Sequence, residues 1–598
     1  MNIINLSIGF APGFDYGIVT DAIEQLHKLG VVVVVANGNS GLDGLFMSEA
    51  PAIAKNAIAV GSMNNIIYKD LSKAVINGQS ILFDFQWEHP WFYSLNTATV
   101  YFVDGCSSYE VEPRSIALVE MDDNCPLKQK VRIAKHHNVE LLMVILKDGY
   151  LNTYQDIKYP IMYVTNPDGQ TLKLIIAEQH ANQMSLKFTK ETIKTRLPGG
   201  GEPSDFSSIG LGSELQLKPE IGAPGHFIYS SLPKSHCQNR DCYATWSGTS
   251  MATPYISGVA ALYLEEFKDP TDFKSALMLT ASPVMKLQNG LYSVAQQGAG
   301  LVNVLALIKD LTTVVPCKLE LLDNVPQRVS LTITNHGRTF RSFTFESTNA
   351  LSIRYGNNTI DSQMFNNKVE FTPSTLNLES GKSRKIFINI KPDPLMMDKD
   401  HWIYSGYIHI KSKEEVVNVP FAGFKGDYTS IPIFPSEYPA IMHNNKLVHN
   451  HTASFITAFD QEDVPVLVLR FVHSVQAIQV QLIGINNKKP IGLIYYDSHV
   501  PKHGNTYNKE DTSNYHFELP LRTKLVDEEV CVGCYSRDTG LKYWDEIPNG
   551  EYYLKVDAQR PMGKVNNKQH YDSWISPKMI VKRKRTAYGM HLLKKMNQ

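Results

Sequence analysis

The sequence predicts an α/β protein whose core is a doubly wound parallel sheet, interrupted by an insertion and followed by β-sandwich domains. Two patterns along the chain predict this order. The first 80 residues alternate short apolar strands with a segment of helical spacing. After Asn303 the chain changes to short strands in which apolar and polar residues alternate, which is typical of β-sandwiches. A chain of 598 residues is long enough to form several hydrophobic cores.

A strand, a helix and two further strands are expected in the first region. Residues 3–8 form a short apolar strand that ends at the turn residue Gly9. Residues 21–29 have the spacing of a helix with one apolar face. Residues 31–35 and 57–61 are β-branched or apolar runs, as found in parallel strands that are covered on both faces. This β-α-β order predicts the parallel sheet.

Residues 81–195 have a different character, with many aromatic residues and short β-type runs. Two strands are expected at 115–120 and 141–146, on either side of a helix-like segment at 128–137. A glycine-rich break at 199–201 ends this region, and the α/β pattern then returns. The order predicts a region inserted into the α/β core.

The second half of the chain is predicted to be all-β. Residues 329–334 and 385–390 alternate with period two, and the first of these runs ends at a turn over 335–337. Further runs of this kind occur at 464–470 and 551–556, so a second β domain is expected.

Composition and charge exclude several classes of partner. Apolar residues make up 43% of the chain and charged residues 20%, as in ordinary globular proteins. The net charge of −1 provides no overall field for nucleic acid, so no nucleic-acid partner is expected. The basic run at 582–585 is expected to be a solvated tail. The sequence has no apolar run of about 18 residues, so no membrane span is expected.

The seven cysteines are few for this length, so disulfides are not expected to be the main framework. Cys237 and Cys242 bracket a short loop, and Cys106 and Cys125 are placed to close another. Cys317 stands alone.

Residues 248–254 (Gly-Thr-Ser-Met-Ala-Thr-Pro) hold a candidate nucleophile, Ser250. A helix is expected to begin near Thr249 and to run to about Phe267, which places Ser250 in its first turn. Free backbone N–H groups at a helix start stabilise a developing oxyanion. The alternative is a Thr-Ser pair that caps the start of a buried helix.

This heptad, continued by residues 259–262, closely resembles the nucleophile motif of subtilisin-like serine proteases, the subtilase or peptidase S8 family. Residues 36–41 (Ala-Asn-Gly-Asn-Ser-Gly) resemble the oxyanion-hole loop of that family, and residues 4–9 resemble the strand that lines its primary specificity pocket. Further signatures follow in the order of the family at 206–210, 218–221, 223–225 and 298–303.

The resemblance implies a serine endopeptidase that cleaves extended polypeptides through an acyl-enzyme. It implies Ser250 as the nucleophile and Asn39 as a side-chain donor to the oxyanion. Substrate binding is implied for Ser7, Ile8, Gly9 and Gly38. The resemblance also implies an extracellular, secreted and monomeric protein whose partners are polypeptide substrates.

The family places its catalytic Asp and His upstream of the pocket strand, and this chain starts at that strand. We therefore predict no triad Asp or His within the chain, and its start has no signal peptide. The sequence is expected to be an N-terminally truncated version of a longer secreted protease, with little activity as it stands. Asp538, His503 and His226 are not expected to serve in a triad. The alternative is a non-catalytic pseudoprotease that acts as an extracellular binding scaffold.

The resemblance extends to other regions. The insertion resembles a protease-associated domain at residues 116–119, Cys125 and Lys130, and residues 314–426 resemble a fibronectin-III-like domain. The predicted domains are the first part of a subtilisin-like catalytic domain at 1–80, the protease-associated-type insertion at 81–195, the second part of the catalytic domain at 196–312, the fibronectin-III-like sandwich at 313–427 and a β-rich domain at 428–598.

No cofactor is predicted. Residues 531–534 (Cys-Val-Gly-Cys) have half-zinc-site spacing, but no second Cys pair or His pair accompanies them. A local disulfide and two free thiols remain the alternatives for this pair. Calcium binding is a habit of the resembled family, yet no acidic cluster in the sequence identifies a site, so no metal ligand is predicted.

Overall fold

The computed structural model describes most of the chain. The described residues are 2–582 except 67, 77, 86–96, 108–110, 113–114, 122–124, 147–158, 179–182, 197–198, 238–241, 287–289, 309–311, 324–326, 357–358, 445, 449–453, 458–463, 487–489, 504–515, 522–546 and 548. Cys531, Cys534, Asp538 and residues 583–585 of the basic run lie outside the described residues. The chain divides into two compact units, one of Met1–Met63 with Pro203–Gln598 and one of Asn64–Glu202.

The core sheet of the first unit has the strand order β1-β3-β5-β13. Its strands are β1 (Ile3–Leu6), β3 (Val32–Ala36), β5 (Ile58–Asn64) and β13 (Ile221–His226). β1 pairs with β3, and β3 pairs with β5, in parallel. The expected parallel sheet is therefore confirmed, and residues 7–9 continue beyond the paired part of β1.

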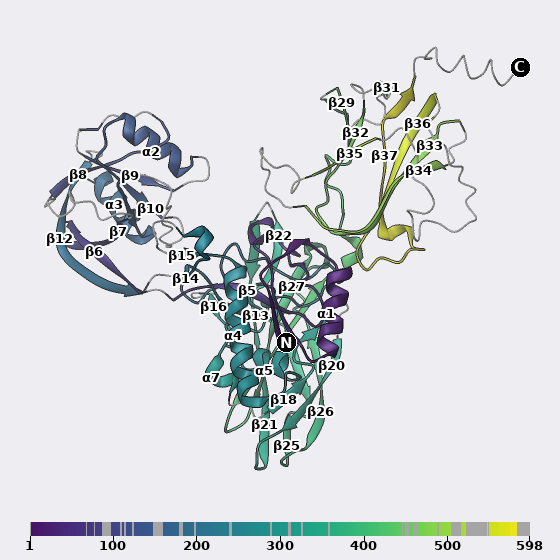
Figure 1. Ribbon diagram of the computed structural model, residues 1–598, viewed down its shortest axis with the longest axis horizontal. Helices are drawn as coiled ribbons and strands as arrows, with labels where there is room; N and C mark the ends of the chain where they lie inside the picture. Colours follow the sequence, from purple (N-terminus) through teal and green to yellow (C-terminus); the bar gives the residue numbers. More distant parts are fainter. Residues whose placement is uncertain are drawn as a thin grey trace, which may run out of the picture. The chain divides into compact units, whose positions relative to one another are not determined.

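Helices cover both faces of this sheet (Figure 1). The helices are α1 (Ile18–Lys28), α4 (Thr249–Phe267) and α5 (Phe273–Leu279). Val34 packs in one cluster with Ile256 of α4, whereas Val35 packs in another with Ile23 of α1. Because successive residues of β3 face opposite layers, the whole strand is apolar.

Several short strands and helices also belong to this part of the chain. They are β2 (Phe10–Pro12), β4 (Glu49–Ala50), β14 (Ile228–Ser231), β15 (Tyr243–Trp246), β16 (Met285–Lys286), β17 (Gly290–Leu291), α6 (Val294–Gln297) and α7 (Val304–Leu307). β2 and β4 pair with each other in antiparallel fashion, outside the parallel sheet.

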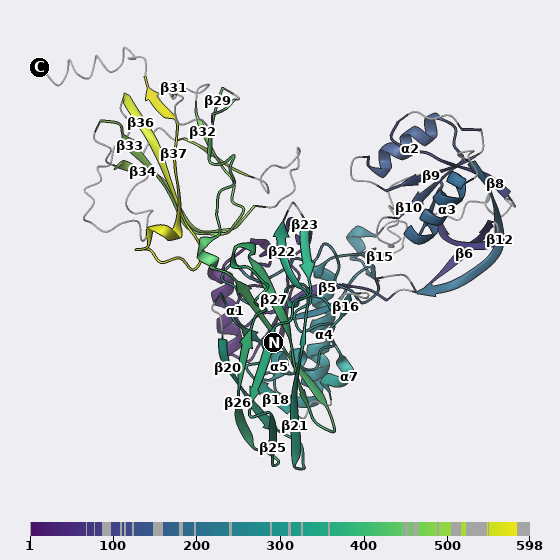
Figure 2. The same cartoon turned by 180° about the vertical axis from the view of Figure 1, so that it is seen from behind.

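The unit Asn64–Glu202 is a closed barrel with the strand order β10-β11-β7-β6-β12-β8-β9, carrying two helices (Figure 2). Its elements are β6 (Tyr68–Ile76), β7 (Gln79–Phe85), β8 (Thr97–Phe102), β9 (Ile116–Glu120), α2 (Leu127–His136), β10 (Leu141–Ile145), β11 (Ile161–Val164), α3 (Asn166–Glu178) and β12 (Gln183–Arg196). β6 pairs with β12, so residues 65–80 join this unit and not the core sheet.

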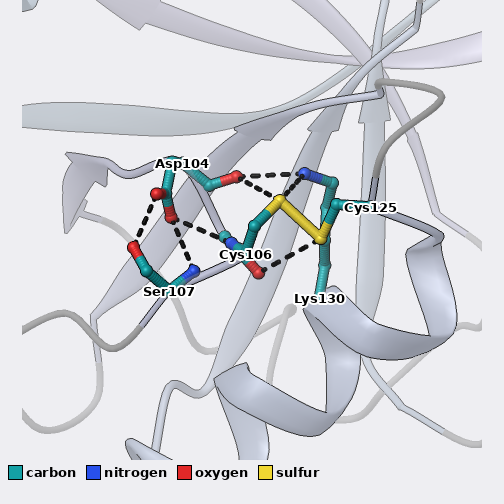
Figure 3. The surroundings of a disulfide bond; sticks show 6 residues. Asp104, Cys106, Ser107, Cys125 and Lys130 are labelled. Carbon is teal, nitrogen blue, oxygen red and sulfur yellow. Dashed lines mark hydrogen bonds between the residues drawn. A yellow bond between two sulfur atoms is a disulfide. The ribbon is translucent and has the colours of Figure 1, made fainter.

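A disulfide between Cys106 and Cys125 closes a loop of this barrel (Figure 3). Beside it, the buried Lys130 donates from Nζ to the Asp104 carbonyl at 3.0 Å. A second disulfide joins Cys237 and Cys242. Both expected loop closures are present, and Cys317 is free.

Two sheets with a shared core form the β-sandwich that begins at Thr312. The first sheet contains β18 (Thr312–Val315), β20 (Gln327–Asn335), β26 (Ser383–Lys391) and β24 (Lys368–Thr372). The second contains β19 (Leu319–Glu320), β28 (Val416–Lys425), β27 (Trp402–Lys411), β21 (Arg341–Asn349), β25 (Thr375–Leu378), β22 (Ser352–Gly356) and β23 (Thr359–Gln363). Leu331 and Ile386 of the first sheet pack in one cluster with Phe343 and Val419 of the second.

The C-terminal part is β-rich, as expected, and has a core of its own. Its strands are β29 (Ala440–His443), β30 (Lys446–Val448), β31 (Ser454–Thr457), β32 (Val466–Leu469), β33 (Val475–Gly484), β34 (Pro490–Val500), β35 (Phe517–Pro520), β36 (Gly550–Gln559), β37 (Tyr571–Ile575) and β38 (Lys578–Val581). Within the described part of the chain, none of the helices has the length and apolar character needed to cross a membrane.

Candidate active site

Ser250 is the second residue of α4, at the end where helix N–H groups have no partners within the helix. Gly248 occupies the N-cap position, so no side chain at that position caps the helix. The Thr249 N–H donates instead to the side chain of Asn39. Among the described residues, the Ser250 N–H has no hydrogen-bond partner. It is therefore available to a bound carbonyl oxygen.

Asn39 is held in one orientation by the start of α4. Its Oδ1 accepts hydrogen bonds from the Thr249 backbone N–H at 2.9 Å and from the Thr249 hydroxyl at 3.0 Å. A backbone N–H only donates, so the atom facing it is the oxygen of the amide and not its nitrogen. The Nδ2 group is thereby directed away from Thr249, and it lies 3.7 Å from the position that a Cβ atom on Gly248 would take. Asn39 thus presents an amide donor beside Gly248, at the start of α4.

Asn37 differs from Asn39 in its surroundings. It is fully buried, and its Nδ2 donates to the carbonyl of Ser208 at 2.8 Å. Its backbone N–H donates to the Val60 carbonyl at 3.1 Å. Asn37 therefore joins the loop to the core, as a structural neighbour of the donor Asn39.

Ser7 and Ser250 bind each other directly. The Ser7 hydroxyl donates to the Ser250 carbonyl at 2.9 Å, and the Ser250 hydroxyl donates to the Ser7 carbonyl at 3.2 Å. Ile8, the next residue, is 52% exposed, and Gly9 is exposed as well. The structure thus places Ser7 beside Ser250, and the two residues that follow Ser7 are exposed.

Gly38 has a backbone that only glycine adopts readily, with φ of 111°. A Cβ atom at this position would also lie 2.5 Å from the Glu49 carboxylate and 2.6 Å from the Ser208 hydroxyl. Its N–H donates to the Thr249 hydroxyl at 3.3 Å. Gly38 therefore allows the loop to approach α4 closely, and this approach positions Asn39.

The two described histidines considered in the sequence, His226 and His503, contact residues other than Ser250. His226 packs against Phe206 and Phe227, and burial lowers its pKa. His503 accepts a hydrogen bond from the Phe471 N–H, and burial lowers its pKa to about 4. Within the described residues, the hydrogen-bond partner of the Ser250 hydroxyl is a backbone carbonyl and not an imidazole.

Glu49 is a site residue that no sequence motif indicated. It belongs to the two-residue strand β4, and its Oε1 accepts from the Asn39 N–H at 3.4 Å. Burial raises the pKa of Glu49 to about 7, although the Asn39 N–H partly opposes this shift. In the sequence, Glu49 is only an acidic residue ten positions after Asn39, and this spacing by itself predicts no contact. The contact arises in the structure, where Glu49 lies in β4 and β4 pairs with β2.

A buried charge cluster supports the sheet behind the site. The Glu220 carboxylate accepts from the Ala59 N–H at 2.9 Å and lies 2.9 Å from Lys218 Nζ. Two further ammonium groups reach it, Lys274 at 2.9 Å and Lys318 at 3.1 Å. Burial alone would raise the pKa of Glu220, but the three lysines lower it overall. Glu220 therefore stays ionised and ties β13 to β5.

A serine at the start of a helix packed on a parallel sheet, with an amide donor beside it, is an arrangement that also occurs in serine hydrolases, where such donors bind an oxyanion. The model of the Subtilase family matches residues 1–301, and the model of an Fn3-like domain matches residues 319–422. The chain therefore belongs to the subtilase family, the subtilisin-like serine endopeptidases, and carries an Fn3-like domain after its catalytic region.

Several curated relatives align with more than half of this chain. The PIII-type proteinase of Lactococcus lactis subsp. cremoris (strain SK11) is 23% identical over 484 residues, which cover 69% of this chain and 24% of the relative. The minor extracellular protease Vpr of Bacillus subtilis (strain 168) is 26% identical over 375 residues, covering 58% of this chain and 44% of the relative. The C5a peptidase of Streptococcus pyogenes serotype M1 is 25% identical over 370 residues, covering 54% of this chain and 29% of the relative. The match thus spans about a quarter of the length of the Lactococcus relative.

Among solved structures, the self-cleaved protease domain of PatA aligns with 52% of this chain and 61% of its own, at 19% identity and a TM-score of 0.23.

Proposed function

We propose that the full-length protein is an extracellular serine endopeptidase that hydrolyses peptide bonds of extended polypeptides, with Ser250 as the nucleophile. The observation that carries this proposal is a pair of N–H donors at the start of α4 that have no hydrogen-bond partner among the described residues. The Ser250 N–H has no partner among the described residues, and the Asn39 Nδ2 is turned away from Thr249 by two hydrogen bonds to Oδ1. Two such donors beside a serine hydroxyl can stabilise the negative charge that develops on the substrate carbonyl oxygen when the hydroxyl attacks.

In the proposed reaction, Ser250 Oγ attacks the carbonyl carbon of the scissile peptide bond. The hydroxyl proton passes to a base, which the family supplies as a histidine on the N-terminal side of the pocket strand. The carbonyl oxygen becomes an oxyanion held by the Ser250 N–H and Asn39 Nδ2. The C–N bond then breaks, the amine leaves with the proton from the base, and water hydrolyses the acyl-enzyme by the same steps.

The substrate chain is proposed to bind along residues 7–9 in an extended conformation. These residues follow the paired part of β1, and Ile8 and Gly9 are exposed. An extended peptide gains main-chain hydrogen bonds by adding itself to an open strand edge. Ser7, Ile8, Gly9 and Gly38 are therefore proposed as substrate-binding residues, and an unfolded polypeptide is the preferred substrate.

The unit Asn64–Glu202 is proposed to be the protease-associated-type insertion, with the catalytic domain on either side of it in the chain. Two features support this: the unit has its own barrel core, and its two ends meet where the Asn64 N–H donates to the Glu202 carbonyl at 2.8 Å. An insertion whose ends meet leaves the surrounding core continuous.

The test compares the full-length protein with its Ser250→Ala variant on a denatured polypeptide substrate. Cleavage is expected for the parent protein and is expected to fall by about 10⁶-fold in the variant. Ser230→Ala, an exposed serine on β14, is the matched control and should leave cleavage unchanged. Retained cleavage in Ser250→Ala would reject Ser250 as the nucleophile. A full-length protein that cleaves nothing would favour the non-catalytic scaffold.

A further inference from the structure

We propose that Glu49 selects the substrate residue before the scissile bond, and that its carboxylate takes the side chain of lysine or arginine there. This inference rests on the proposed function, because it assigns the substrate preference of the same site. Four observations carry it: the fixed backbone of Glu49, the place of its carboxyl group, the absence of a counter-charge among the described residues, and its burial.

The backbone of Glu49 is held on both sides. Its N–H donates to the carbonyl of Asn37 at 3.1 Å, and its carbonyl accepts from the Ile53 N–H at 3.1 Å. β4 also pairs with β2, where Glu49 lies opposite Pro12. A residue anchored in this way directs its side chain from a defined point, which a residue on a loose loop does not.

The side chain of Glu49 extends from β4 to the two segments proposed to bind substrate. A Cβ atom on Gly38 would lie 2.5 Å from Oε1, and a Cβ atom on Gly9 would overlap Oε2. The carboxyl group therefore occupies the space between Gly9 and Gly38, which only glycine at both positions leaves open. The Asn39 N–H, 3.4 Å from Oε1, links the same carboxyl to the residue that carries the proposed oxyanion donor.

No cation neutralises this carboxyl group within the described residues. Glu49 takes part in none of the ion pairs of the described chain, and its described hydrogen-bond partner is the Asn39 N–H. The side chain is half-buried, and this burial raises the pKa of Glu49 to about 7. A half-buried carboxylate without a counter-ion is unfavourable, and a bound ammonium or guanidinium group removes that penalty.

The chemistry separates the candidate side chains. Lysine and arginine donate charged hydrogen bonds to the carboxylate, glutamine donates a neutral one, leucine donates none, and glutamate is repelled. A desolvated charge pair of this kind changes selectivity by about tenfold or more. The site is therefore expected to rank substrates in the order lysine or arginine, glutamine, leucine and glutamate.

The first experiment measures kcat/KM of the full-length protein at pH 8.5 for peptides that differ only in the residue before the scissile bond. The lysine peptide is expected to exceed the leucine peptide by about tenfold or more. Glu49→Gln keeps the shape of the side chain and is expected to bring this ratio close to one. Glu266→Gln, a carboxylate exposed on α4, is the control and should leave the ratio unchanged. A leucine preference, or a lysine preference that survives Glu49→Gln, would overturn the proposal.

The second experiment separates this proposal from the catalytic role of Ser250. The same uncleaved peptides are titrated calorimetrically into Ser250→Ala and into Ser250→Ala with Glu49→Gln. The lysine peptide is expected to bind Ser250→Ala about tenfold more tightly than the leucine peptide, and this difference is expected to disappear when Glu49→Gln is added. Such a result supports the Glu49 assignment even if the parent protein, with Ser250 intact, shows no cleavage. If cleavage requires Ser250 but neither experiment shows a preference for lysine, the Glu49 assignment is overturned and the role of Ser250 stands. A protein that neither cleaves nor binds these peptides overturns both proposals.

Discussion

Ser7 and Ser250 exchange hydrogen bonds in both directions, hydroxyl to carbonyl at 2.9 Å and 3.2 Å. The bond from Ser7 Oγ fixes the start of α4 against the end of β1. The bond from Ser250 Oγ directs this hydroxyl, the proposed nucleophile, towards the segment proposed to hold the substrate. The pair therefore holds the start of α4 and the segment after β1 against each other.

Ser7→Ala removes the bond to the Ser250 carbonyl but keeps the Ser7 carbonyl itself. Loss of one such hydrogen bond costs about 1 kcal/mol, so kcat/KM is expected to fall about fivefold through kcat. Steady-state kinetics on a peptide substrate measure the change. An unchanged kcat would show that this bond does not position Ser250.

Asn39→Asp separates the two functions of the Asn39 side chain. Aspartate still accepts the hydrogen bonds of the Thr249 N–H and hydroxyl, but it has no N–H to donate to an oxyanion. The turnover number is expected to fall by about 10²–10³-fold, with little change in thermal unfolding. If kcat falls by less than about threefold while the fold is intact, Asn39 is not an oxyanion donor.

The proposed preference of Glu49 depends on pH. The residues that lie against the Glu49 carboxyl, Gly9, Gly38 and Asn39, carry no titratable side chain. Because the pKa of Glu49 is raised to about 7, its carboxylate is present above pH 7 and is lost as the pH falls through that value.

The ratio of kcat/KM for lysine and leucine peptides measures this titration, because protonation of the catalytic base affects both peptides equally. The ratio is expected to rise between pH 6 and 8 and to stay flat in Glu49→Gln. A ratio that is independent of pH in the parent protein would contradict an ionising Glu49 in the site.

Glu220→Gln tests the buried charge cluster. The variant removes the carboxylate that Lys218, Lys274 and Lys318 share. Lys318 keeps its ion pair with Glu320 at 2.9 Å, but Lys218 and Lys274 lose the carboxylate that they contact among the described residues. The free energy of unfolding of the first unit is expected to fall by about 3–5 kcal/mol at pH 7. Denaturant unfolding measures the loss, and Glu265→Gln on the exposed side of α4 is the control. A loss no larger than that of the control would show that the cluster is not needed for stability.

The sequence predicted those strands and helices whose own residues show a clear pattern, such as a β-branched run or a helical spacing of small and apolar residues. The run at 31–35 became β3 because β-branched residues covered on both faces leave few alternatives. The helix expected from Thr249 to Phe267 has those bounds in the structure, since its small residues allow α4 to pack closely on the sheet. The helix expected at 21–29 begins earlier, at Ile18, after Gly17.

Long-range pairing explains what the sequence did not predict. Residues 65–80 look like a continuation of the core, but β6 finds its partner in β12, where Val75 lies opposite Lys187. Glu49 was missed for the same reason. Its strand has two residues and no periodicity, and its carboxyl acquires a role only through the pairing of β4 with β2 and the closeness of two glycines.

The most direct test of the central claim is covalent labelling of Ser250. The full-length protein is treated with a peptidyl phosphonate that carries lysine at the position before the reactive group, and the modified residue is located by mass spectrometry. One adduct is expected, on Ser250, and it is expected to be absent from Ser250→Ala. No adduct on Ser250, or an adduct elsewhere that persists in Ser250→Ala, would contradict the assignment of Ser250 as the nucleophile.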